Sequence, residues 1–181
     1  RCNSGRQFPD PAIISVFNKL SFERVSDISV ALSRRETISI ASSDPCISDP
    51  PTVCYEVAYY TFSISLPVNQ TGYILASEVN YRIRGITNIN SSQVGATYSC
   101  EIPGSVPVAD GYTNISAVFT GSDLVVVCAN NFFSYSFAAK DDDGDLLRYS
   151  FCSAFASTNA GVNGVPAGNP PYRSVPYNSP E

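Results

Sequence analysis

The stretch GYILASEVNYRIRGI, residues 72–86, predicts the fold class because apolar and polar side chains alternate along it. Every second position is apolar over most of its length, at Tyr73, Leu75, Val79, Tyr81 and Ile83. The intervening positions include the polar Glu78, Asn80, Arg82 and Arg84. A period of two is typical of a β-strand with one buried face. The pattern therefore predicts a half-buried strand, with Glu78 on its polar face.

Similar strand patterns recur along the chain, and no helical pattern competes with them. The shorter candidates are residues 12–17, 27–32, 37–41, 96–102, 124–128, 132–138 and 146–155. Residues 53–66 form a longer candidate whose apolar parity changes, which predicts a bulge or bend near Ala58 and Tyr59. The connections are rich in Pro, Gly, Asn and Ser, as is typical of a β-sandwich.

These patterns predict an all-β chain with two immunoglobulin-like β-sandwich domains in tandem. Residues 1–103 form the first domain and residues 104–181 the second, with a proline-containing hinge at 102–112. The second domain is expected to be incomplete, because it offers about five strand candidates where such a sandwich needs roughly seven. Either the natural chain continues past Glu181 or a neighbouring molecule supplies the missing strands.

The composition of the chain argues against several classes of function. The net charge is −5, the pI is near 4.6 and the basic residues are scattered, so nucleic-acid backbones are not expected partners. No segment approaches the roughly 18 apolar residues of a membrane span. The chain has no His, which removes Ser-His-Asp and Cys-His catalysis and histidine-ligated zinc. No Ser or Cys lies in a nucleophile motif, so the chain is predicted not to be an enzyme.

The six cysteines form an even set without a C-x-x-C pair, which favours disulfides and an extracellular location over zinc. Any export signal is then expected to have been removed already. Cys46 and Cys54 flank a short proline-rich loop that can bring them together, so they are predicted to pair. Cys128 and Cys152 lie in two strand candidates of the second domain and are predicted to link neighbouring strands. By elimination, Cys2 is predicted to pair with Cys100.

The acidic turn KDDDGD, residues 140–145, is the strongest candidate site. It is not an EF-hand, because a loop starting at Asp141 has Leu146 at position 6 and Cys152 at position 12. It is not predicted to be catalytic, because adjacent carboxylates diverge. Calcium takes several oxygen ligands in flexible geometry, and Gly144 allows a sharp bend. The sequence predicts a calcium site and leaves an unliganded acidic turn as the alternative.

The ligands predicted for this site are Asp141, Asp143 and Asp145, because alternation puts the odd-numbered aspartates on one side of the turn. Asp142 is expected to point to solvent.

Several stretches resemble one family. DDDGDLLRYSFC, residues 141–152, resembles the D-x-D-G-D-x-L-x-Y-x-x-C pattern of PKD or cadherin-like repeats in large secreted Bacteroidota surface proteins. The segments around RCNSG, DPCISDPPTVC, GATYSCEIPG and NPPYRSVPYNSP are similar to these proteins in order and spacing. Such proteins often end in a gliding-motility-associated domain and leave the cell by type IX secretion. The chain departs from the family at NYRIRGI, where members often have two cysteines.

The resemblance implies a secreted or cell-surface module for adhesion, gliding or extracellular structure, without catalysis. The cysteines and the acidic turn add the expectation that disulfides stabilise the module and calcium stiffens it. Its implied partners are other domains of the same long chain or neighbouring fibre subunits. One alternative is a carbohydrate-binding accessory module that recognises surface glycans through its Tyr and Phe residues, although their spacing is typical of core positions. Another is a fibre subunit completed by strand exchange. The sequons at Asn69, Asn90 and Asn114 are interpreted as chance matches in Asn-rich turns.

Overall fold

The structure is a computed structural model that describes residues 7–39, 54–82, 86–89, 94–105, 114–121, 125, 127, 130–159 and 164–178. The described residues contain strands and no helix, which confirms the prediction of an all-β chain. The strands are β1 (Ala12–Asn18), β2 (Arg24–Val30), β3 (Arg34–Ser39), β4 (Cys54–Tyr59), β5 (Tyr73–Val79), β6 (Ala96–Ile102), β7 (Val118–Phe119) and β8 (Ala139–Lys140).

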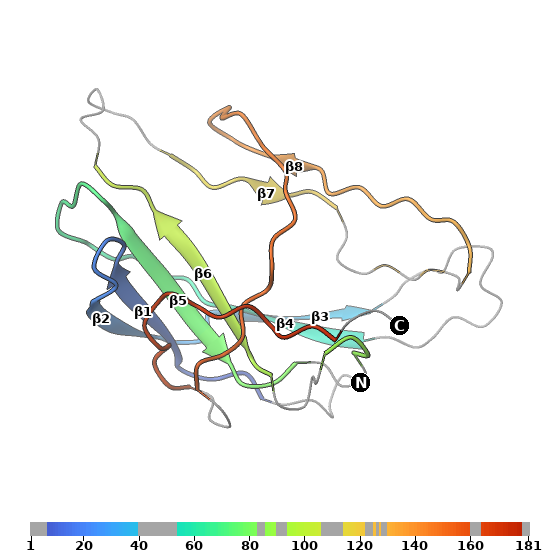
Figure 1. Cartoon of the computed structure of the whole chain (residues 1–181), viewed down its shortest axis with the longest axis horizontal. Helices are drawn as coiled ribbons and strands as arrows, with labels where there is room; N and C mark the ends of the chain where they lie inside the picture. The colour runs from blue at the N-terminus through green and yellow to red at the C-terminus, as the bar shows by residue number, and fades with distance from the viewer. Residues whose placement is uncertain are drawn as a thin grey trace. The chain divides into compact units, whose positions relative to one another are not determined.

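The largest sheet has four strands in the order β2-β1-β5-β6, and all of its neighbours are antiparallel (Figure 1). Strands β3 and β4 form a second sheet, and the short antiparallel pair β7 and β8 forms a third. The strand predicted at 96–102 is confirmed as β6, and those predicted at 12–17 and 27–32 correspond to β1 and β2 with shifted ends. The strand predicted within 72–86 is β5, which ends earlier, at Val79.

The chain divides into two compact units, and both are discontinuous in sequence. One unit comprises Arg1–Gly5, Glu36–Val57 and Val108–Phe151, and the other comprises Arg6–Arg35, Ala58–Pro107 and Cys152–Glu181. This division differs from the predicted domains 1–103 and 104–181. The difference arises because residues after Cys152 contact the four-stranded sheet, as the bridge from Phe155 to Thr97 of β6 illustrates.

In the unit that contains Arg6–Arg35, Ala58–Pro107 and Cys152–Glu181, the hydrophobic core lies against the four-stranded sheet. Phe17, Ile74, Ala76 and Ala167 form a buried cluster, with Tyr172 packed against it. In β1, the adjacent Val16 and Phe17 are both 0% exposed, although they point to opposite faces. Both faces of this central strand are therefore covered, which explains its nearly continuous apolar sequence AIISVF.

The face of β5 that was predicted to be polar and exposed is buried in the structure. Glu78 is 7% exposed and Asn80, which follows the strand, is 5% exposed. The reason lies in the segment Cys152–Glu181 of the same unit, called the C-terminal stretch below. Its residues Ser157 and Thr158 donate hydrogen bonds to the Glu78 carboxylate. A buried carboxylate is tolerated where such donors satisfy it.

Several strands predicted outside the four-stranded sheet do not form as expected. Residues 132–138 are irregular, and residues 146–155 contribute only the isolated bridge at Phe155. Apolar side chains in these stretches are exposed, with Phe132 at 97% and Phe151 at 100%. Strand propensity alone does not form a ladder when the apolar face has nothing to pack against. Most of the strand predicted at 124–128 lies outside the described residues.

The longer strand predicted over 53–66 is also shorter in the structure. Strand β4 ends at Tyr59, so the predicted bend near Ala58 and Tyr59 is a strand end rather than a bulge. The Tyr60 hydroxyl then donates a hydrogen bond to the Pro9 carbonyl at 2.7 Å. This contact ties the start of the following irregular segment to the N-terminal part of the same unit.

Candidate functional site

The acidic turn brings together the three aspartates that the sequence singles out. Asp141, Asp143 and Asp145 each offer a carboxylate oxygen, and these oxygens lie within 4.8 Å of one another. The turn begins directly after β8, and the Asp145 backbone N–H donates a hydrogen bond of 2.9 Å to Asp141 Oδ1. This bond closes the turn so that alternate side chains converge.

A second segment of the same unit holds the turn in place. The Ile115 backbone N–H donates to Asp143 Oδ2 at 2.6 Å, and Asn114 Nδ2 donates to Asp145 Oδ2 at 3.0 Å. Both residues precede β7, which pairs with β8 through Val118 and Lys140. The carboxylates therefore link two segments that are distant in sequence.

The remaining residues of the turn have separate roles. Gly144 has φ of +85°, a left-handed conformation that side-chain-bearing residues rarely adopt, and no atom crowds its Cβ direction. Asp142 forms an ion pair of 2.5 Å with Lys140, and its side chain is 61% exposed. Asp142 thus points to solvent, away from the oxygens of its three neighbours.

The convergence of carboxylates changes their proton affinities. A side-chain hydrogen bond from Asp143, aided by the Asp145 backbone N–H, lowers the pKa of Asp141. The same contact with Asp141 raises the pKa of Asp143, and the negative charges of Asp141 and Asp145 add to the rise. Like charges this close disfavour full ionisation. A bound cation would remove that repulsion.

The donor set suits a hard cation of flexible geometry. Calcium binds carboxylate, carbonyl and water oxygens at about 2.3–2.6 Å, so ligands around one ion lie up to about 5 Å apart. The spacing of 4.8 Å or less between the aspartate oxygens fits this range. Calcium needs six to eight ligands, so bidentate carboxylates, carbonyls or water would have to complete the shell.

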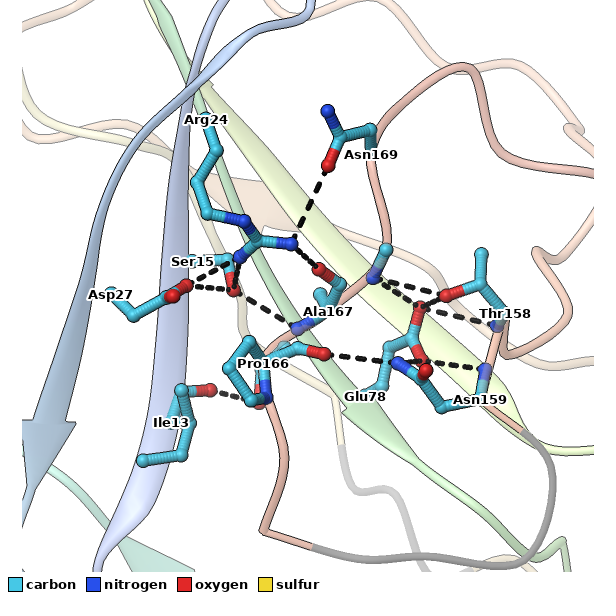
Figure 2. A network of polar contacts seen from close by, with 12 residues as sticks. Ile13, Ser15, Arg24, Asp27, Glu78, Thr158, Asn159, Pro166, Ala167 and Asn169 are labelled. Carbon is cyan, nitrogen blue, oxygen red and sulfur yellow. Dashed lines mark hydrogen bonds and ion pairs between the residues drawn. The ribbon is translucent and has the colours of Figure 1, made fainter.

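A second polar cluster lies on the four-stranded sheet, and sequence reasoning missed it. Its centre is Glu78 of β5, whose carboxylate accepts hydrogen bonds from Thr97 of β6 and from the C-terminal stretch. Figure 2 shows Thr158 and Asn159 of that stretch next to the carboxylate. The donors are Thr97 Oγ1, Ser157 Oγ, the N–H and hydroxyl of Thr158, the N–H and side-chain amide of Asn159, and the Gly168 N–H. Their distances range from 2.7 Å for Thr158 Oγ1 to 3.3 Å for Gly168 N.

An arginine on β2 extends this cluster. Arg24 pairs with Asp27 at 2.5 Å and donates to Ser15 Oγ at 2.8 Å, as Figure 2 shows. Its other nitrogen donates to the Ala167 carbonyl at 2.5 Å, and the guanidinium lies 4.8 Å from the centroid of the Phe17 ring. The Ala167 N–H in turn donates to Ser15 Oγ at 2.9 Å. Two strands therefore hold the backbone of the C-terminal stretch.

The surroundings of Glu78 favour its charged form. Burial alone raises the pKa of Glu78, but hydrogen bonds from Thr158, Ser157 and Gly168 outweigh it and leave the pKa below the usual 4.5. The same low-polarity environment raises the pKa of the Tyr172 phenol to about 12, through burial first and the Glu78 charge second. The cluster is thus an anionic anchor for the C-terminal stretch. The one sequence signal for it is an acidic residue inside a largely apolar strand.

The cysteines differ from the predicted pairing. Cys54 is disulfide-bonded, and its predicted partner Cys46 lies outside the described residues, so this pairing stays a prediction. Cys100 and Cys152 are free thiols. The predicted partners Cys2 and Cys128 lie outside the described residues, and the free thiols of Cys100 and Cys152 show that neither is paired in the structure. Cys152 is not in a strand of the second block as expected but begins the stretch that joins the sheet unit.

The sheet also carries an open apolar pocket of about 280 Å³. It is lined by Ile14, Phe62, Leu75, Ala76, Ser77, Tyr98, Ser99 and Cys100. The lining has few polar groups to orient a ligand, so the pocket by itself does not indicate a small-molecule site.

Comparison of the chain with family models, with curated proteins and with solved structures returned no match. Among the described residues, no helix is long and apolar enough to cross a membrane.

Proposed function

We propose that the chain is a non-enzymatic structural or adhesive module of a secreted or cell-surface fibre protein, stiffened by calcium at Asp141, Asp143 and Asp145. The observation that carries the proposal is the convergence of these three carboxylates within 4.8 Å. The hydrogen bonds from Asn114 and Ile115 add to it, because a cation there would clamp the turn to the segment before β7. In an extended surface protein, such a clamp would resist local opening.

The extracellular location is supported by the cysteines. Cys54 is disulfide-bonded, and disulfides persist mainly in oxidising compartments. In this proposal, the two units are immunoglobulin-like β-sandwiches. The resemblance to PKD or cadherin-like repeats of secreted Bacteroidota proteins belongs to the same proposal.

The thermal midpoint in calcium and in chelator tests the cation site. Calcium at a hundredfold excess over its Kd should raise the midpoint of the unit that contains the turn by about 5–10 °C, because the ion binds only the folded form. Asp143→Asn should abolish this shift, since it removes the central carboxylate charge. Asp142→Asn is the matched control and should keep it, because Asp142 pairs with Lys140 instead. Equal midpoints with and without calcium in the native chain would leave the turn as an unliganded acidic loop.

A second candidate is a fibre subunit whose sandwich is completed by a strand from a neighbour. Exposed apolar side chains in the unit of the acidic turn favour it, including Phe119 at 66%, Phe132 at 97% and Leu146 at 84%. Exposed apolar side chains that form a continuous patch are typical of an interaction site. This candidate requires the sedimentation coefficient to rise with protein concentration, whereas the leading proposal requires a constant monomer value.

The exposed aromatic rings are consistent with the alternative function, a carbohydrate-binding module. Phe132 and Phe151 are more exposed than core residues would be, and sugars can stack on such rings. Binding on a glycan array that is lost in Phe132→Ala would favour this function over a purely structural one.

A further inference from the structure

The two free thiols occupy matching positions on neighbouring segments. Thr97 of β6 and Phe155 of the C-terminal stretch form an isolated antiparallel bridge. Cys100 lies three residues after Thr97, and Cys152 lies three residues before Phe155. Partner positions in an antiparallel pair run in opposite directions. Continuing the same pairing by three residues therefore brings Cys152 directly opposite Cys100.

The backbone of the C-terminal stretch has the hydrogen-bond phase that this continuation needs. The Thr97 N–H donates to the Phe155 carbonyl at 3.2 Å, so Phe155 directs its carbonyl at β6. Its neighbours face the other way: the Ala156 N–H donates to Arg173 O at 2.9 Å, and the Ala154 carbonyl accepts from Val175 N at 2.8 Å. By alternation, the backbone groups of Ser153 face β6 again.

The bridge at Phe155 is isolated in the structure; if the pairing continued to residue 152, this phase would make Cys100 and Cys152 a non-hydrogen-bonded pair. Residues in such a pair have Cα atoms about 4.5 Å apart and side chains on one face of the sheet. Disulfides usually join Cα atoms about 4.4–6.8 Å apart, so the position is compatible with a cross-strand bond.

A disulfide at Cys100 would lie at the apolar pocket on the four-stranded sheet. The residue lines the apolar pocket beside Leu75 and Tyr98. Burial raises the pKa of the Cys100 thiol, which disfavours the thiolate and slows its reaction with other molecules. A partner held directly opposite overcomes this by proximity.

We propose that Cys100 and Cys152 form a disulfide as residues 152–154 extend the pairing of Phe155 along β6. The oxidant is an external disulfide, as in thiol–disulfide exchange. One protein thiolate attacks it and forms a mixed disulfide, and the second protein thiolate then attacks the protein sulfur of that bond. The two protein thiols lose two electrons and two protons in total, and the external disulfide takes them up as two thiols.

The bond would fasten the beginning of the stretch that covers Glu78. Cys152 is the first residue of this stretch, and Thr158 and Gly168 farther along it donate to the carboxylate. The disulfide also closes a loop of roughly 50 residues, a length at which a cross-link restricts the unfolded chain strongly. The redox state would thus set how firmly the C-terminal stretch stays on the sheet.

Peptide mapping of the native chain tests the pairing. The full chain is refolded in a mixture of oxidised and reduced glutathione, free thiols are alkylated, and the protein is digested without reduction. The expected product is a cross-linked peptide pair that contains Cys100 and Cys152. Linkage of either residue to Cys2 or Cys128 would overturn the proposal, as would alkylation of both in a chain whose Cys54 is oxidised.

Paired variants provide a second readout. Cys100→Ser, Cys152→Ser and the double variant should each lower the thermal midpoint of the oxidised chain by the same amount, about 5–15 °C. A reductant should remove the differences that depend on this bond, and Ser153→Ala serves as a control that keeps both thiols. Additive losses in the double variant would show that the two residues act independently and would contradict the bond.

Discussion

Replacing Glu78 with alanine is expected to lower the free energy of unfolding by about 3–5 kcal/mol, because removing one partner of a buried charged cluster leaves the others unsatisfied. The carboxylate is buried and accepts hydrogen bonds from Thr158, Asn159 and Gly168. These donors, which belong to the C-terminal stretch, would lose their acceptor on β5. Denaturant unfolding followed by circular dichroism measures the loss.

The matched control is Glu101→Ala on β6. Glu101 forms a surface ion pair with Lys19, and its side chain is 60% exposed, so the change should cost less than about 1 kcal/mol. A loss for Glu78→Ala no larger than for Glu101→Ala would show that the carboxylate does not anchor the C-terminal stretch.

The same cluster predicts a pH dependence. The folded pKa of Glu78 lies below the usual 4.5, so its stabilisation is fully present above that value. As the pH falls through the lower folded pKa, the carboxylate takes up a proton and the stabilisation is lost. The difference in unfolding free energy between the native chain and Glu78→Gln should therefore shrink as the pH falls below 4.5. A difference that stays constant down to pH 3 would contradict an ionised anchor.

Replacing Phe17 with alanine is expected to cost about 3–5 kcal/mol of stability, since a large buried side chain leaves a cavity. Phe17 is 0% exposed and packs in the cluster with Ile74 and Ala167. The loss should appear as a lower denaturant midpoint with an unchanged slope.

Leu20 provides the control for this substitution. It lies in the turn after β1 and is 75% exposed, so Leu20→Ala should change stability by no more than about 0.5 kcal/mol. A Phe17→Ala loss below about 1 kcal/mol would mean that the C-terminal stretch does not close the core over the sheet.

The sequence predicted the strands well where packing agrees with local pattern. The alternation in residues 72–86 indicated β5, and residues 96–102 form β6 with the predicted ends. The sequence did not predict the burial of side chains that depends on contacts between distant parts of the chain. Glu78 follows the polar parity of its strand, yet a stretch about 80 residues later buries it, and no local pattern contains that information.

The acidic turn was more predictable because its geometry is local. Alternation around Gly144 is sufficient to bring Asp141, Asp143 and Asp145 together, and the structure places their oxygens accordingly. The contacts from Asn114 and Ile115 were not predictable, since they join segments that are distant in sequence. The partners predicted for Cys100 and Cys152 are not bonded to them for the same reason, because such pairs depend on register between distant segments, whereas Cys46–Cys54 stays a prediction.

Calorimetric titration of the chelator-treated chain with calcium tests the central claim most directly. The account predicts one calcium ion per chain, with binding lost in Asp143→Asn and Asp145→Asn and kept in Asp142→Asn, because only the first two substitutions alter the converging oxygens. Absence of saturable binding at millimolar calcium, or binding that survives both ligand substitutions, would contradict it.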